Sequence, residues 1–311
     1  MQLIIFILVV FVPFVVPVSP IFTILVTMKS TFTLFFLITC FTITFSQKKQ
    51  AYIIYNAKGK KTSYEKMIKK VADKEVVFIG ELHNDPIAHW MEYEITNDLG
   101  GKKTLVLGAE MFEADNQTPL RQYITGEINA KKLDSTARLW KNYFTDYAPL
   151  VDLAKKNKWP FIATNIPRRY ASQVARQGLE SLDTLPGSVK SWIAPLPIEY
   201  DAELPGYKNM LKMMAGHGGP NLPKAQAIKD ATMAHFILTN MKAGTQFIHY
   251  NGSYHSENHE GIIWYLKRKK PDLQYATITT LHQKDILTLS KENFNKAHFI
   301  ICIDDNMTPT Y

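Results

Sequence analysis

The chain has 311 residues, of which 46% are hydrophobic, and a formal net charge of +8 that is spread along its length. The densest basic run, Lys267-Arg268-Lys269-Lys270, lies where a predicted helix ends before Pro271; cations at that end complement the helix dipole, so nucleic acid is not an expected partner. Of the two cysteines, only Cys302 follows the predicted targeting region, which excludes an internal disulfide, a cysteine-based zinc site and any reason to expect thiol catalysis.

Residues 1–46 have the features of a signal or targeting region. Lys29 is the only charged residue there, and the apolar run after it ends in the small residues that a signal peptidase recognises. Met28 is therefore the expected true start, and the mature protein is expected in the periplasm or cell envelope. Two alternatives involve the membrane, because the apolar stretch before Met28 is long enough to cross a bilayer and Cys40 is a candidate for a lipid anchor.

From residue 47 to residue 311, short apolar segments alternate with helical patterns, as expected for a single α/β domain. Strands are predicted at 52–55, 76–80, 104–109, 161–164, 246–250, 274–278 and 298–303. Helices are predicted at 63–73, 86–99, 115–124, 130–142, 146–158, 167–178, 201–215, 223–242 and 257–270. The alternation indicates a mostly parallel β-sheet covered by helices on both faces.

Several of these helices carry clear end signals. Asp85 before Pro86 predicts a capped start for the second helix, and Gly100-Gly101 predicts its end. Ser256 is the predicted cap of a helix that begins at Glu257.

Polar side chains that turns do not require follow four of the predicted strands. In open α/β sheets, ligands bind outside the carboxyl ends of the strands, so these side chains are expected to share one rim. Turns need glycine, asparagine, aspartate and serine rather than histidine and glutamate, which makes the convergence informative. The candidate site residues are Glu81, His83, Glu110, Asn165, Arg168, Arg169 and His255.

Each charged candidate also has a purely structural alternative. Glu81 ends an apolar strand, where a carboxylate needs a partner, and Arg168 or Arg169 is the structural candidate. Glu110 could cap a helix. The two arginines begin a helix, a position that suits an anionic ligand such as a carboxylate or propionate, although one of them is expected to be merely solvated.

Other ionisable residues are expected outside the site. Asp230 is expected to be structural and to pair with an arginine. His89, His235 and His259 lie on predicted helices and are expected to be satisfied locally or to face solvent.

The segment 207–219 follows a proline-rich loop and has an apolar helical face. One interpretation is an amphipathic helix that packs on the core. The other is a helical lid inserted over the site, from which Tyr207 or His217 reaches a metal, since methionines adapt to flat apolar ligands. The residues concerned are Tyr207, Met210, Leu211, Met213, Met214 and His217.

Five motifs occur in an order that resembles the ChaN-like haem-binding proteins, within a wider group that includes the Tiki/TraB proteins and the erythromycin esterases. The resemblance covers roughly residues 60–280. The motifs are GELH at 80–83, AEMFE at 109–113, NIPRR at 165–169, KDATMA at 229–234 and GSYH at 252–255.

This resemblance implies an exported haem-binding protein that acts in haem or iron uptake. It implies haem bound at the interface of a homodimer, with a tyrosine on the iron and a histidine of the partner near the propionates. On position alone, Tyr207 is the first candidate for the iron ligand and Tyr254 the second.

The same resemblance implies an alternative, a hydrolase of the protease or esterase type. In its metal-dependent form, His83, His255 and either Glu81 or Glu110 bind a divalent ion, and the remaining glutamate is the general base. In its metal-free form, Glu81 orients His83, which activates water directly. A soft-metal carrier that uses the methionines and histidine of 207–219 is a third hypothesis, ranked below both.

Overall fold

The computed structural model describes residues 49–213 and 219–311, and within it Gln50–Tyr311 forms one compact unit. The predicted targeting region, Met214 and His217 lie outside the described residues. Within those residues, no helix combines the length and the apolar character that crossing a membrane requires.

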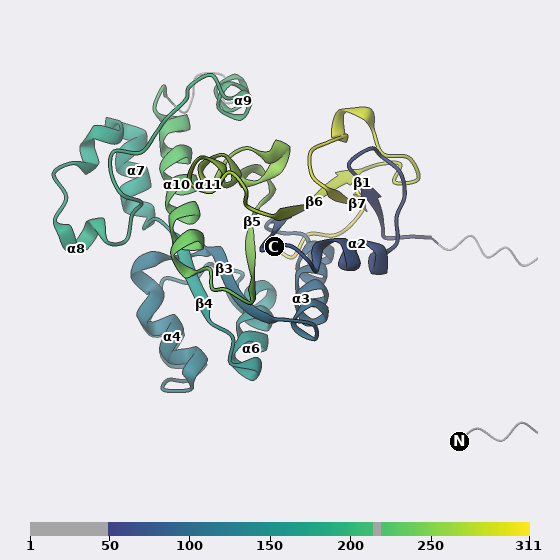
Figure 1. Cartoon of the computed structure of the whole chain (residues 1–311), viewed down its shortest axis with the longest axis horizontal. Helices are drawn as coiled ribbons and strands as arrows, with labels where there is room; N and C mark the ends of the chain where they lie inside the picture. The colour runs from purple at the N-terminus through teal and green to yellow at the C-terminus, as the bar shows by residue number, and fades with distance from the viewer. Residues whose placement is uncertain (1–48, 214–218) are drawn as a thin grey trace, which may run out of the picture. The chain divides into compact units, whose positions relative to one another are not determined.

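A seven-stranded sheet forms the centre of the unit, with the strand order β1-β7-β6-β2-β5-β3-β4 (Figure 1). Every pair of neighbours is parallel except β1 and β7, which are antiparallel. All seven predicted strands form, and the mostly parallel α/β fold is confirmed. The strands are β1 (Tyr52–Asn56), β2 (Val76–Glu81), β3 (Thr104–Glu113), β4 (Phe161–Asn165), β5 (Thr245–Gly252), β6 (Tyr275–Gln283) and β7 (Phe299–Asp304).

Helices cover both faces of this sheet, as the continuously apolar strands require. The helices α2 (Tyr64–Val71), α3 (Pro86–Gly100), α4 (Gln117–Thr125), α5 (Ala130–Thr136) and α6 (Ala148–Asn157) pack against one face. On the other face lie α10 (Leu222–Asn240) and α11 (Ile262–Lys269). The helices α7 (Arg168–Gln177) and α8 (Gly187–Lys190) form a satellite cluster against α10, and α9 (Pro205–Met213) begins the segment that was predicted as a lid.

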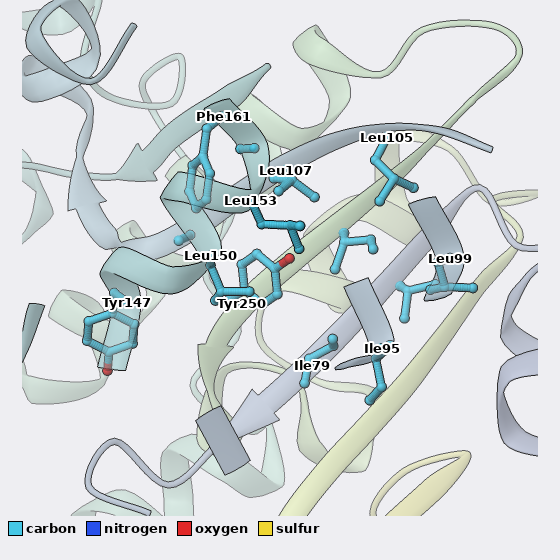
Figure 2. Close-up of a cluster of buried hydrophobic side chains, with 14 of the residues drawn as sticks. Ile79, Ile95, Leu99, Leu105, Leu107, Tyr147, Leu150, Leu153, Phe161 and Tyr250 are labelled. Carbon is cyan, nitrogen blue, oxygen red and sulfur yellow. The ribbon is translucent and has the colours of Figure 1, made fainter. Parts of the chain in front are cut away.

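The larger core lies between the sheet and the face formed by α3 and α6 (Figure 2). In Figure 2, Ile79 of β2 lies near Ile95 of α3, and Tyr250 of β5 lies near Leu150 of α6. These side chains are at most 2% exposed. Their burial fixes the register of β2 and β5, two of the four strands whose carboxyl ends carry the candidate site.

Three predicted helices are shorter than expected, and the helix predicted at 201–215 begins only at Pro205. The helix predicted at 130–142 ends at Thr136, because Ala137 is extended and Arg138 turns away to pair with two carboxylates of the β3 end. The helix predicted at 257–270 begins only at Ile262, since Asn258 and His259 have positive φ angles of 56° and 60°.

The predicted cap at Ser256 is therefore wrong, and that at Asp85 is right. The Ser256 hydroxyl accepts a hydrogen bond from Asn251 instead of capping a helix. Asp85 Oδ1 accepts the amide of Ala88 at 2.7 Å in the first turn of α3. Asp85 thereby fixes the short loop that leads from β2 through His83 into α3.

Candidate functional site

Glu81 is the last residue of β2, and its side chain is almost wholly buried at the carboxyl edge of the sheet. Its Oε1 lies 2.6 Å from His83 Nδ1 and accepts the Tyr147 hydroxyl at 2.8 Å. Burial opposes ionisation of the carboxyl, but the hydrogen bond from His83 and the ion-pair contact with His89 prevail and lower the pKa of Glu81 to about 2. Glu81 is therefore a carboxylate at neutral pH, and its partners are histidines, not the arginines suggested by the structural alternative.

The imidazole of His83 is held at one ring nitrogen and is about one-third exposed at the other end. Because the Glu81 carboxylate accepts at Nδ1, that nitrogen carries the proton, and Nε2 lies beside Gly252 at the end of β5. Burial opposes protonation of His83, but the bond to Glu81 and the charge of Glu110 raise its pKa. The ring packs edge-on against Trp140 at a centroid distance of 4.9 Å.

The backbone around His83 is fixed as firmly as its side chain. Its carbonyl oxygen accepts hydrogen bonds from Asn142 Nδ2 and from His89 Nε2, both at 3.1 Å. The β2–α3 loop therefore holds His83 in one orientation.

Gly252 ends β5 directly opposite Glu81 in the parallel register. Its amide donates to Glu110 Oε2 at 2.8 Å. A Cβ at this position would lie 2.8 Å from His83 Nε2 and 3.5 Å from Glu110 Oε2. His83 and Glu110 therefore face each other across Gly252, and only a residue without a side chain leaves room for them.

His255, three residues further on, lies buried between two carboxylates. Its Nε2 is 3.1 Å from Glu110 Oε1, and its Nδ1 is 2.5 Å from Asp230 Oδ1. Burial disfavours the imidazolium, but the charges of Glu110 and Asp230 outweigh it and raise the pKa of His255 to about 9. Burial also raises the pKa of Asp230, whereas the pKa of Glu110 is lowered despite its burial, mainly by the charge of His255. His255 is therefore an imidazolium held between two carboxylates at neutral pH.

The remaining rim candidates divide between the site and the surface. Asn165 is buried at the end of β4 and donates to the Glu110 carbonyl oxygen at 3.0 Å. Arg168 and Arg169 are exposed, and Arg169 pairs with Asp115 at 2.8 Å. The structure thus brings Asn165 to the site and leaves both arginines at the molecular surface.

The two candidate tyrosines lie on α9 and beside it, and the Tyr207 hydroxyl is buried without a hydrogen-bond partner among the described residues. Tyr207 is buried and stacks on Tyr200 at a centroid distance of 5.5 Å, and burial raises its pKa. The Tyr254 hydroxyl donates to the carbonyl oxygen of Gly206, and burial raises its pKa to about 12. Beyond Tyr207, α9 exposes Leu211 and Met213, which are 43% and 72% exposed.

Sequence reasoning missed several residues that contact the candidates. Asp230 pairs with His255 and not with an arginine, so that expectation was wrong. His89 is satisfied, as expected, but inside the site rather than apart from it. The spacing of His89 and Glu92, one turn apart on α3 and facing β2, was a usable signal. Tyr147 ends a π-helical turn, Tyr143–Tyr147, that precedes α6 and was only partly covered by the helix predicted at 146–158.

Comparison with known proteins gives one family match and several similar structures. Residues 67–266 match a family model described as "Haem-binding uptake, Tiki superfamily, ChaN". The structure "Cofacial heme binding to ChaN of Campylobacter jejuni" is similar at 17% sequence identity and a TM-score of 0.63, covering 82% of this chain and 98% of that chain, which shows a shared fold. A mutant erythromycin esterase, EreC, in its open conformation matches at 9% identity and a TM-score of 0.47, covering 83% of this chain and all of the other. No curated protein matches.

Proposed function

Because the chain belongs to the family of haem-binding uptake proteins of the Tiki superfamily, we propose that it binds haem as an exported uptake protein of the cell envelope. The observation that carries the proposal is the family match over 67–266, which includes every strand end of the candidate site. The similar ChaN structure, which is described as binding haem cofacially, supports the same ligand. The signal-like pattern of residues 1–46 supports export.

The side chains near the rim fit a flat, mostly apolar ligand with an anionic edge. Phe144, Leu211 and Met213 are between 43% and 72% exposed, an unusual exposure for large apolar side chains that a porphyrin face would cover. The exposed guanidinium of Arg168 could receive a propionate. Tyr207 is the first candidate for the iron ligand and Tyr254 the second. To bind iron, Tyr254 would have to break its hydrogen bond to the Gly206 carbonyl oxygen.

The cofacial arrangement named for the ChaN structure supports a homodimer of this chain around its haem. Two haems that face each other need two protein surfaces, each covering one outer porphyrin face. We therefore expect the protein to self-associate when haem is added.

A haemin titration of the purified protein, followed by absorbance and analytical ultracentrifugation, tests the proposal. We expect saturable binding with a ferric tyrosinate spectrum and dimerisation at saturation. Tyr207→Phe or Tyr254→Phe should abolish that spectrum, while the control Tyr93→Phe on α3 should retain it. Weak binding that does not saturate, with no change in mass, would rule out this function.

A second candidate, a hydrolase, rests on one specific observation. Glu81 fixes Nδ1 of His83, so that Nε2 points across Gly252 toward Glu110. A base oriented by a buried carboxylate is the arrangement that activates water or a nucleophile. Both nitrogens of His255 already contact carboxylates, so this geometry favours the metal-free form over a metal held by His83, His255 and Glu81.

A screen of ester and peptide substrates tests the hydrolase. Turnover should fall at least 100-fold in Glu81→Gln and in His83→Ala, because each removes one half of the oriented base. His282→Ala is the matched control, since His282 forms another histidine–carboxylate pair at the same sheet edge, with Asp85 at 2.5 Å. Equal loss in the control variant would show that the effect is structural.

A further inference from the structure

Beneath the rim, a second group of ionisable side chains lies between β2 and α3. His89 and Glu92 extend from successive turns of α3 toward Glu81 at the end of β2. All three are at most 7% exposed. One ligand atom from each lies within 4.8 Å of the others, so the three side chains surround a common point.

The distances between these atoms match those around a small metal ion. His89 Nδ1 is 3.1 Å from Glu81 Oε2 and 3.4 Å from Glu92 Oε2. An ion with bonds of about 2.0–2.2 Å to nitrogen and oxygen keeps neighbouring ligand atoms roughly 3–3.6 Å apart in tetrahedral geometry. The side chains therefore need little rearrangement to coordinate an ion.

Two oxygens of this group are poorly satisfied, since Glu81 Oε2 has only the ion-pair contact with His89 Nδ1 at 3.1 Å. Glu81 Oε2 and Glu92 Oε1 are buried and accept no hydrogen bond from the residues that the structure describes. Buried carboxylate oxygens are almost always paired or bound to a cation, because their desolvation is otherwise uncompensated. Both oxygens belong to the group around His89, so a single ion would satisfy both.

The opposite nitrogen of His89 is held as it would be in a metal ligand. Nε2 lies 3.1 Å from the His83 carbonyl oxygen and 3.4 Å from Asp146 Oδ2. Because a carbonyl oxygen can only accept, Nε2 carries a proton. Nδ1 faces the two carboxylates, and a cation bound there would replace the proton that Nδ1 shares with them. Ligating histidines usually donate their other N–H to a carboxylate or carbonyl in this way.

The Asp146 carboxylate, which supports His89, accepts hydrogen bonds from two further side chains. Asp146 Oδ2 accepts Asn142 Nδ2 at 2.7 Å and the Thr310 hydroxyl at 2.9 Å. Such outer contacts orient the ligands before any ion arrives.

We propose that Glu81, His89 and Glu92 bind one divalent transition-metal cation of the Zn²⁺ or Mn²⁺ type. One imidazole and two carboxylates are ligands that suit these ions. The ligands are buried, so the ion is structural: it joins α3 to β2 and neutralises the paired carboxylates under the rim. This site uses a different ligand set from the one formed by His83 and His255, and it is independent of haem binding.

Equilibrium dialysis of the chelator-treated protein against Zn²⁺ and Mn²⁺, with elemental analysis, tests the site. We expect one ion per chain in the wild type and at least a 100-fold weaker affinity in the isosteric Glu92→Gln variant. Glu94→Gln, a change of the same kind on the same helix, should bind as the wild type does. His255→Ala should also keep the ion, which separates this site from the rim. Asp146→Asn, which removes only a supporting contact, should weaken binding about 10–100-fold.

Thermal unfolding gives a second measurement that does not depend on counting ions. Zn²⁺ should raise the Tm of the wild type and of Glu94→Gln, and should leave that of Glu92→Gln unchanged. The proposal is overturned if the wild type retains no stoichiometric ion, in which case a proton on His89 alone balances the carboxylates. It is also overturned if the ion survives in Glu92→Gln but is lost in His255→Ala.

Discussion

Replacement of His255 by glutamine should remove a large part of the pH dependence of stability. In the folded protein the pKa of His255 is raised to about 9 by Glu110 and Asp230, whereas an unfolded histidine has a pKa of about 6.5. A raised folded pKa stabilises the protein fully below about pH 6.5, and this contribution is lost as the pH rises through about 9. Since one pH unit is worth about 1.4 kcal/mol for one proton, the loss is about 3 kcal/mol.

Urea denaturation at intervals from pH 6 to pH 10 measures this effect. The free energy of unfolding of the wild type should fall by about 3 kcal/mol more than that of His255→Gln across this range. His235→Gln is the control, because His235 lies on α10 with no carboxylate partner among residues 49–213 and 219–311, and burial lowers its pKa. It should follow the wild-type profile. Parallel profiles for the wild type and His255→Gln would refute the inference that the two carboxylates hold a proton on His255.

Three further substitutions test the packing of the site and both ends of α3, the helix that follows His83. Gly252→Ala places a Cβ 2.8 Å from His83 Nε2, so the imidazole must shift away from the Glu81 carboxylate. An NMR titration should then show the pKa of His83 lowered toward its ordinary value, and an unchanged pKa would contradict this. Gly100→Ala places a Cβ 2.0 Å from the Trp159 ring, so calorimetry should show the free energy of unfolding lowered by about 1–3 kcal/mol. An unchanged Tm would mean that the ring moves aside without cost. Asp85→Ala removes the cap of α3 and should lower the free energy of unfolding, measured by urea denaturation, by about 1 kcal/mol. An unchanged free energy would show that the cap is dispensable.

The arrangement of the sheet could be predicted because each central strand carries its own signal. The apolar run at 76–79 has no polar face, and a strand of that kind has to be buried on both sides. Residues 247, 248 and 250 of β5 are buried in the same way. The irregular start of α11 could not be predicted, since positive φ angles at Asn258 and His259 depend on contacts with distant segments.

The candidate site was predictable only where it lies at strand ends. The strand-end rule identified Glu81, His83, Glu110 and His255, because parallel strands bring their carboxyl ends to one edge. It could not identify Asp230, which extends from the middle of α10 and reaches His255 through the packing of that helix on the sheet. Partners supplied by helix faces depend on tertiary packing, which a single sequence does not encode locally.

Glu81 connects the rim with the buried group, because each of its oxygens belongs to one of them. Its Oε1 faces His83 and Tyr147, and its Oε2 faces His89. If a cation leaves the buried group, the two hydrogen bonds at Oε1 remain, and the His83 backbone is still held by Asn142. Removal of the ion should therefore lower the stability of the α3–β2 contact far more than it displaces the His83 imidazole. The buried ion and the Glu81–His83 pair at the rim can then be altered independently, although both involve the Glu81 carboxylate.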